Sequence, residues 1–263
     1  MSKTFLPQDH SIPAATTVRV VPDALKTPTQ QVSLLFQLLF GLANVACWLT
    51  VLPLSLIMIP MQVAALDPTH KFSNLALISG AGALTSLIVN PLAGALSDRT
   101  TSRFGRRRPW LAVGTLLSAV TLLLLAHATT FLLLLACWTL FHVAINIILA
   151  SLTAILPDKV PLRQRATISA VLGLSQPLGA VIGTLLVTKN VKTPYVAYDL
   201  LIGVLLISML LFLLVMRENA LPKGTIPALE WRNLLSTFWV NPMRFPAFAW
   251  AWLTRCLRAN QKN

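Results

Sequence analysis

Six long apolar segments, separated by short charged connections, constrain this sequence more than any other feature. An α-helix needs about 20 mostly apolar residues to cross a lipid bilayer. Segments of roughly this length or longer run from about 32 to 66, 74 to 96, 110 to 126, 131 to 156, 167 to 187 and 195 to 216. We therefore predict an all-α, polytopic membrane protein with six transmembrane helices.

The charge content excludes an ordinary soluble domain. Charged residues make up only 11% of the chain, against roughly 25% in soluble proteins. The 21 Lys and Arg residues outnumber the 8 Asp and Glu residues, which in a soluble chain would suggest nucleic-acid binding. Here the basic residues lie between apolar segments, so the expected partner is the lipid bilayer and not a nucleic acid.

The positions of the basic residues predict the orientation of the chain. Short connections force neighbouring helices to be antiparallel, and cytoplasmic loops of membrane proteins carry an excess of Lys and Arg. The N-terminal tail, the loops 97–109 and 157–166 and the region from 217 onward hold 18 of these residues, whereas the alternate loops hold three. We therefore expect a multi-pass protein of the cell membrane with both termini in the cytoplasm.

Four parts follow from this pattern. We expect a cytoplasmic tail over 1–31, a six-helix bundle over 32–216, a cytoplasmic connector over 217–244 and the start of a seventh helix over 245–263. The apolar run Phe245–Leu253 is too short to cross a bilayer, and polar residues follow it. We interpret the last part as an incomplete seventh helix of a truncated or frameshifted chain, or of a fragment.

The loop after the second segment carries the most specific motif. Residues 94–109 read Gly-Ala-Leu-Ser-Asp-Arg-Thr-Thr-Ser-Arg-Phe-Gly-Arg-Arg-Arg-Pro. Gly94 lacks a side chain, so neighbouring helices can approach closely there. Asp98 ends a helix among five arginines, where it can accept charge-assisted hydrogen bonds or bond the free N–H groups of a neighbouring helix start.

This loop resembles motif A of the major facilitator superfamily, in the extended form of the sugar–cation symporters that include glycoside–pentoside–hexuronide and sucrose carriers. The resemblance implies the N-terminal half of such a carrier, built from two inverted three-helix repeats. It also implies that this loop latches the cytoplasmic face in the outward-open state. Alternatively, the arginines only determine topology. The implied latch residues are Gly94, Asp98, Arg99, Gly105, Arg106 and Arg107.

A second segment, Leu-Pro-Asp-Lys-Val-Pro-Leu-Arg-Gln-Arg over 156–165, resembles the same branch. Asp158 can pair with Arg163 or Arg165 across this turn, although the alternative is a solvated turn. In the fifth segment, Gly179 and Gly183 form a Gly-x-x-x-Gly pair, which predicts a close helix-packing face.

Polar residues inside membrane spans are costly and mark candidate solute pathways. His142 and Asn146 share one helix face, where they could bond a sugar hydroxyl. His142 is also the one residue of this half that could titrate within a span. The alternative for all candidates is a helix–helix hydrogen bond. The candidates are Gln37, Asn44, His142, Asn146 and Gln176.

Chemical catalysis is not expected. The sequence has no phosphate-binding glycine loop, no cluster of metal ligands and no nucleophile beside a base, so we predict no cofactor, no metal and no enzyme activity. Three scattered cysteines, Cys47, Cys137 and Cys256, show no pairing or metal-binding spacing.

The family resemblance implies secondary active transport of a small solute, such as a sugar or glycoside, by alternating access. Coupling to protons or sodium ions is expected in this branch. We expect the chain to be inactive alone, because the missing C-terminal half or another copy must complete the cavity. The alternative function is a non-transporting membrane partner or regulator of a full-length carrier.

Overall fold

The computed structural model describes residues 28–190 and 193–216 together with Glu218. Most of the expected N-terminal tail, and the expected connector and seventh helix apart from Glu218, lie outside the described residues. The described residues form helices and turns and contain no strand. The prediction of an all-α chain is confirmed.

Six helices or helix combinations are long and apolar enough to cross a membrane in the described part of the chain. The first combines α1 (Leu34–Pro53), a π-helical segment η2 (Leu54–Met58) and α2 (Ile59–Leu66). The others are single helices. They are α3 (Lys71–Asp98), α4 (Arg108–Ala126), α5 (Phe131–Lys159), α6 (Leu162–Lys189) and α7 (Pro194–Val215).

Two prolines explain why the first span changes its helical form. Pro53 has no N–H to offer the carbonyl of Leu49, and Pro60 likewise leaves a carbonyl of the preceding turn without its usual donor. Between them, the N–H of Ile59 bonds to the carbonyl of Leu54, five residues back. The span therefore continues through one π-helical turn between the two prolines, which are sites where helices distort.

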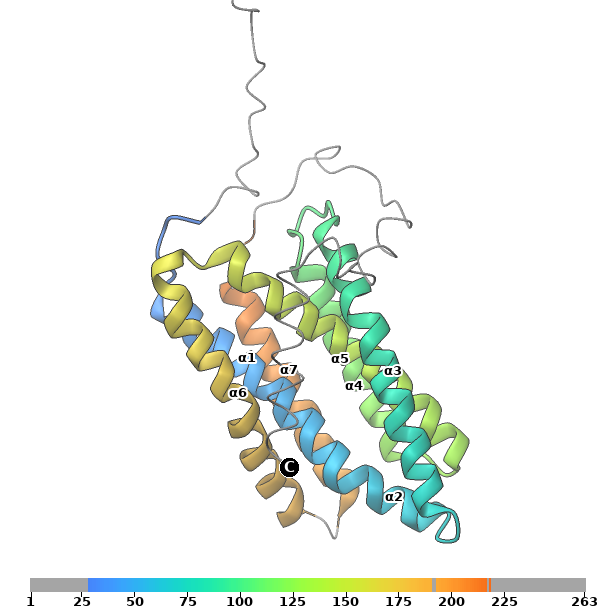
Figure 1. Ribbon diagram of the computed structural model, residues 1–263. Helices are drawn as coiled ribbons and strands as arrows, with labels where there is room; N and C mark the ends of the chain where they lie inside the picture. Colours follow the sequence, from blue (N-terminus) through green and yellow to red (C-terminus); the bar gives the residue numbers. More distant parts are fainter. Residues whose placement is uncertain (1–27, 191–192, 217, 219–263) are drawn as a thin grey trace, which may run out of the picture.

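The six spans pack as two groups of three, and these groups do not follow the order of the spans along the chain. The first helix α1 packs against α6 and α7, whereas α5 packs against α3 and α4, and α4 also contacts α7. Figure 1 shows α1, α6 and α7 on one side of the bundle and α3, α4 and α5 on the other. Along the chain, the first three spans end with α4 and the second three begin with α5. Because three is an odd number, the second three begin on the opposite side of the membrane from the first three, as expected for inverted repeats.

Glycines allow the closest contacts between helices. A Cβ atom on Gly179 of α6 would lie 2.7 Å from the backbone nitrogen of Leu49 in α1, and one on Gly183 would lie 2.8 Å from Pro53. The predicted packing face of Gly179 and Gly183 is confirmed. Gly183 also approaches the carbonyl of Leu49, the same group that Pro53 leaves without its helical donor.

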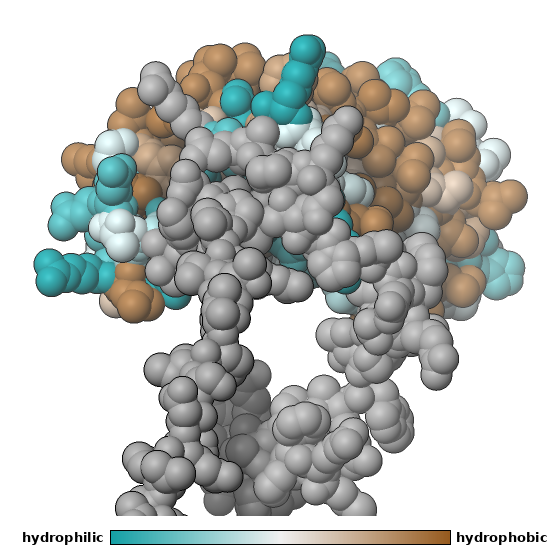
Figure 2. Space-filling view, turned by 90° about the horizontal axis from the view of Figure 1, so that it is seen from above, coloured by the Kyte–Doolittle hydropathy of each residue, from teal (hydrophilic) through white to brown (hydrophobic). Residues whose placement is uncertain are grey.

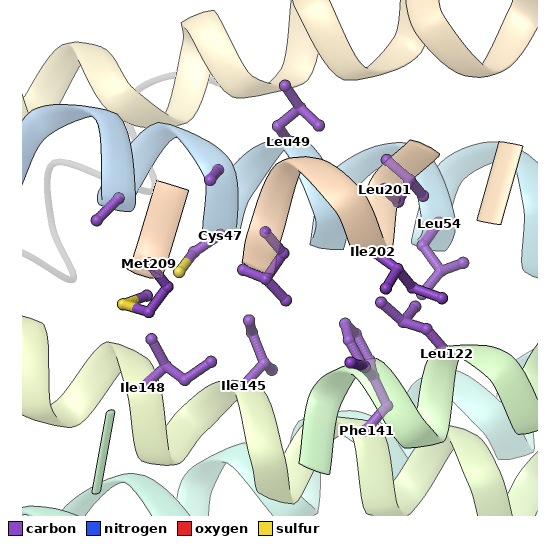
Figure 3. Packing of buried hydrophobic residues seen from close by; sticks show 14 of the residues in the cluster. Cys47, Leu49, Leu54, Leu122, Phe141, Ile145, Ile148, Leu201, Ile202 and Met209 are labelled. Atoms are coloured by element: carbon purple, nitrogen blue, oxygen red, sulfur yellow. The ribbon is translucent and has the colours of Figure 1, made fainter. Parts of the chain in front are cut away.

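Large apolar side chains join the two sets of helices at the centre of the bundle. Figure 3 shows residues of α1 and α7 opposite residues of α4 and α5. Cys47 and Met209, for example, lie opposite Ile148. The outer rim is also apolar in the view of Figure 2. Leucine side chains such as Leu84 and Leu132 are more than half exposed. A surface of this kind suits lipid and does not suit water.

Candidate functional site

A cavity of about 580 Å³ lies between α1, α3, α5 and α6. Its apolar lining comes from valine, isoleucine and leucine side chains, and one glycine of α6 also borders it. Polar and aromatic groups interrupt this lining on α1, α3 and α5. They are Asn44, Trp48, Ser86, Asn90, His142, Asn146 and Thr153.

Three of these side chains form one hydrogen-bonded network between α3 and α5. The amide Nδ2 of Asn146 donates to Ser86 Oγ at 2.9 Å and to the carbonyl of His142 at 2.8 Å. Ser86 Oγ lies 3.0 Å from Nδ1 of His142 and donates to the carbonyl of Gly82 at 2.9 Å. The expected pair of His142 and Asn146 therefore lies on one face that borders the cavity.

The other ring nitrogen of His142 has an unusual position. Its Nε2 atom is buried and has no hydrogen-bond partner within the part of the chain that the structure describes. A Cβ atom on Gly82 would lie 2.9 Å from this Nε2 and 2.9 Å from Nε1 of Trp138. Trp138 in turn packs edge-on against the His142 ring, with centroids 4.5 Å apart, and donates to the carbonyl of Ile78. The imidazole is thus held between two helices.

The remaining expected pathway residues divide into two groups. Asn44 borders the cavity, where its amide donates to the carbonyl of Phe40 at 2.8 Å. Gln37 and Gln176 do not line the cavity. Gln37 donates to the carbonyl of Val32 near the start of α1, and Gln176 is exposed on α6.

Sequence reasoning missed several lining residues, because serine, threonine and tryptophan occur in many membrane helices without a pathway role. A signal was nevertheless present on α3. Gly82, Ser86 and Asn90 follow one another at intervals of four, which places them on one face of a helix. This small and polar face is the one that meets α5 and the cavity.

An ion-pair cluster lies at the arginine-rich end of the bundle. This end is formed by the loop between α3 and α4 together with the loop between α5 and α6. The cluster consists of Asp98, Arg106, Arg107 and Asp158. Arg106 donates to Asp158 Oδ2 at 2.6 Å, and Arg107 donates through Nε to the same oxygen at 3.2 Å. Arg107 also bonds Asp98 and Ser97 through its two terminal nitrogens.

Arg107 is the centre of this cluster. Its side chain is 3% exposed, against 52% for Asp98 and 24% for Asp158. A buried guanidinium needs charged partners, and these come from the ends of α3 and α5. One arginine of the loop thereby links two helices that are far apart in sequence.

The pairing differs in part from the expected one. We expected a latch of Asp98 with Arg99, Arg106 and Arg107. Asp98 pairs with Arg107, whereas Arg106 pairs with Asp158. We also expected Asp158 to pair with Arg163 or Arg165. Arg163 is exposed on the first turn of α6, and Arg165 donates to the carbonyls of Val160 and Pro157 instead. The loop arginines reach Asp158 because α3 packs against α5.

The two glycines of the motif have different roles. Gly105 has φ of 99°, which glycine adopts far more easily than other residues. A Cβ atom there would also collide with Glu218, which lies beyond the end of α7. Gly94 was expected to permit a close helix approach, but no described atom lies within 4 Å of its Cβ position. Its carbonyl accepts a hydrogen bond from Ser97.

Glu218 is a further part of this end that the sequence did not indicate. Its Oε2 accepts hydrogen bonds from the backbone N–H groups of Arg107 at 2.8 Å and Arg108 at 3.2 Å. The described residues contain no group of three or more His, Cys, Asp or Glu side chains that could hold a metal ion.

Comparison with known proteins gives a family match over most of the chain. The family model described as Major Facilitator Superfamily matches residues 34–259. The general alpha-glucoside permease of Schizosaccharomyces pombe is 33% identical over 122 residues, with 40% of this chain and 22% of the permease covered.

Two plant proteins are also similar. The sucrose transport protein SUC4 of Arabidopsis thaliana is 32% identical over 93 residues, with 35% of this chain and 18% of that protein covered. The sucrose transport protein SUC3 of the same plant is 27% identical over 153 residues, with 49% of this chain and 25% of that protein covered. The matches thus cover a quarter or less of the length of these relatives.

Proposed function

This chain belongs to the Major Facilitator Superfamily, and from that premise we propose that it serves secondary active transport of a small solute, a sugar or glycoside, by alternating access. The observation that carries the proposal is the cavity whose polar lining comes from α1, α3 and α5. In this class of carrier, substrate sites lie near the middle of the membrane between repeats.

The chemistry of the lining fits a neutral, hydroxyl-rich solute. Amides and hydroxyls such as those of Asn44, Asn146 and Ser86 both donate and accept hydrogen bonds, as sugar hydroxyls require. Trp48 adds an aromatic face on which the C–H face of a sugar ring can pack. The lining contains no carboxylate and no lysine or arginine among the described residues, so a charged solute has no counter-ion there. The relatives named for glucosides and sucrose support the same class of solute.

The arginine-rich end is proposed to face the cytoplasm of a cell membrane, with both termini on that side. The support is the distribution of Lys and Arg, 18 against three between the two sets of connections. On this orientation the ion-pair cluster is the latch of the cytoplasmic face. Asp98 is half exposed, so a partner that closes over this end can reach its side chain.

We assign proton coupling to His142. It lies between α3 and α5 beside the cavity, with Nδ1 near Ser86 Oγ and Nε2 buried without a described partner. An imidazole with one satisfied and one unsatisfied nitrogen can gain a proton when solute or water changes its surroundings. The alternative coupling ion, sodium, would require oxygen ligands, which Asn44 and Ser86 supply only in part.

A second six-helix bundle is proposed to complete the cavity. The least buried spans of the bundle are α3 and α6, and both border the cavity. A C-terminal half or another copy of this chain would cover them. Chemical cross-linking in native membranes distinguishes the alternatives: a homodimer indicates pairing of copies, and a discrete complex with a full-length carrier indicates the role of a partner or regulator.

Solute binding tests the proposal directly. Purified full chain in lipid nanodiscs is expected to bind radiolabelled sucrose or maltose, and an excess of unlabelled sugar should displace it. Asn146→Leu should weaken binding about fivefold, because one lost hydrogen bond is worth about 1 kcal/mol. Thr139→Val is the matched control, since the Thr139 hydroxyl bonds within α5 and lies outside the cavity lining.

Binding that no sugar displaces, or that Asn146→Leu and Thr139→Val affect equally, would contradict this site. Transport gives a separate test. In liposomes with an imposed proton gradient, the 263-residue chain alone is expected to show no sugar accumulation, because one bundle cannot alternate access by itself. Accumulation at the rate of a complete carrier would refute the requirement for a second bundle.

A further inference from the structure

A second groove, separate from the polar cavity, lies at the arginine-rich end of the bundle. It has a volume of about 240 Å³ and lies between the loop that precedes α4, the first turn of α4 and the last turn of α7. Its lining residues are Ser102, Phe104, Arg108, Pro109, Ala112 and Leu213.

The loop side of the groove is polar and positively charged. Arg108 donates through one terminal nitrogen to the carbonyl of Leu213 at 2.9 Å, which uses one of the five N–H donors of a guanidinium. Ser102 accepts a hydrogen bond from the backbone N–H of Phe104, and its hydroxyl proton can be donated to a ligand. The guanidinium of Arg103 lies 4.7 Å from the centre of the Phe104 ring, so a second positive charge is held beside the groove.

The neighbouring carboxylates already have partners. Glu218 accepts the backbone N–H groups of Arg107 and Arg108, and Asp98 pairs with Arg107. Neither carboxylate lines the groove. Among the described residues, no carboxylate lines the groove beside Arg108, so its positive charge can attract an outside anion.

The opposite side of the groove is apolar and belongs to the membrane spans. Pro109 and Ala112 lie in the first turns of α4, and Leu213 lies in the last turn of α7. The groove therefore extends from the depth of lipid headgroups, where the spans end, into the depth of acyl chains. A ligand that fits both sides has an anionic head and an apolar tail.

We propose that this groove binds an anionic phospholipid of the adjoining leaflet, with the headgroup phosphate on Arg108 and Ser102 and an acyl chain along Ala112 and Leu213. Charge complementarity favours this occupant, because the chain carries a formal net charge of +13 and five arginines in this one loop. Basic pockets between membrane helices on the cytoplasmic side bind such headgroups. The lipid would connect the loop to α4 and α7, next to Arg107 of the ion-pair cluster.

Native mass spectrometry of the purified full chain tests the proposal. The chain is titrated in detergent with phosphatidylglycerol or with phosphatidylcholine, and retained lipid is counted. More phosphatidylglycerol than phosphatidylcholine is expected to remain bound. Arg108→Gln should weaken phosphatidylglycerol binding about fivefold, which corresponds to the roughly 1 kcal/mol that one arginine contributes near anionic lipid.

Two further variants separate the groove from general surface charge. Arg163→Gln removes an exposed arginine at the same end but outside the groove, so it should leave lipid retention unchanged. Ala112→Phe fills the apolar side without changing charge and should lower retention of phosphatidylglycerol. If Arg108→Gln does not fold, Arg108→Lys and Ala112→Phe provide the comparison.

Three results would overturn the proposal. They are equal retention of the two lipids, equal losses in Arg108→Gln and Arg163→Gln, and full retention in Ala112→Phe. None of these results depends on whether the chain binds sugar, so this inference and the proposed transport function can fail separately.

Discussion

The backbone N–H of Arg107 donates a hydrogen bond to the carboxylate of Glu218 at 2.8 Å, although 111 residues separate the two along the chain. Arg107 is the residue that caps the start of α4, where the N–H groups have no carbonyl one turn earlier to bond. Glu218 supplies the missing acceptor from beyond the end of α7. This contact holds the arginine loop against the last span.

Removal of the Glu218 carboxylate should therefore destabilise the bundle at this end. Glu218→Ala is expected to lower the free energy of unfolding by about 1.5–3 kcal/mol, the range for hydrogen bonds to a charged group. Glu218→Gln keeps an acceptor oxygen and should lose less. Thermal unfolding of the detergent-solubilised chain measures both, and an unchanged melting temperature in Glu218→Ala would contradict the capping role.

Gly105→Ala should be destabilising for two independent reasons. Its φ of 99° strains any residue with a side chain, by about 1–2 kcal/mol, and the new methyl group would collide with Glu218. The double variant Gly105→Ala with Glu218→Ala should lose less than the two single losses combined, since the collision disappears. Gly94→Ala is the control, because its Cβ position is open within the described residues, and it should not lower stability.

Asp158→Asn should test the ion-pair cluster. Asp158 is a charged partner of both Arg106 and the almost fully buried Arg107. Loss of its charge leaves a buried guanidinium with Asp98 alone, and a decrease of about 3 kcal/mol is expected. The matched variant Arg163→Gln alters an exposed side chain and should stay within about 0.5 kcal/mol of the parent. Equal behaviour of the two variants would mean that Asp158 is merely part of a solvated turn.

Gly82→Ala should affect both stability and solute binding. Its methyl group would lie 2.9 Å from His142 Nε2 and from Trp138 Nε1, so two packed rings must move, at about 1–3 kcal/mol. The displaced imidazole should also weaken sugar binding. Gly80→Ala on the same helix places a methyl group where no neighbouring described atom lies within 4 Å, and it should be neutral or stabilising. If Gly82→Ala binds sugar as tightly as the parent chain, the position of His142 does not matter for solute binding.

The turn between α2 and α3 should respond to acid. The backbone N–H of His70 donates to Asp67 and lowers the pKa of that carboxyl below its usual range, with further help from the side chains of His70 and Asn74. Because the folded-state pKa is lowered, the stabilising contribution is present above the ordinary pKa of 3.8 and is lost as the pH falls below it.

Hydrogen exchange can measure this effect. Protection of the amides around His70 should stay constant from neutral pH to about 4 and decrease as the pH is lowered from about 4 toward 2, after correction for intrinsic exchange. Asp67→Asn should abolish that pH dependence. Protection that stays constant through this acidic range in the parent chain would show that the carboxylate does not hold the turn.

The ion-pair cluster shows why part of the site escaped prediction. The motif indicated that Asp98 and loop arginines act together, but not that Arg107 is the buried member. Which of five neighbouring arginines turns inward depends on the path of the loop around Gly105 and on Glu218, a residue from the other end of the bundle. Nothing in the spacing of the motif contains that information.

The lining of the cavity was likewise predicted only in part. His142 and Asn146 were predicted to share a face because helical periodicity is local. Gln37 and Gln176 were equally polar and yet lie outside the cavity lining, because their helices turn those positions elsewhere. Ser86 joined the site only through the packing of α3 on α5, which Gly82 permits.

The sequence by itself determined that the chain forms six membrane-spanning helices and approximately where each begins and ends. Those features are local: a helix satisfies its own backbone bonds, and bilayer thickness sets its apolar length. Only the tertiary structure decided that α1 packs with α6 and α7, that Asp158 meets Arg106 and Arg107, and that Glu218 caps α4. Such contacts join residues that are distant in sequence, and their partners are selected by shape and charge once the helices have assembled.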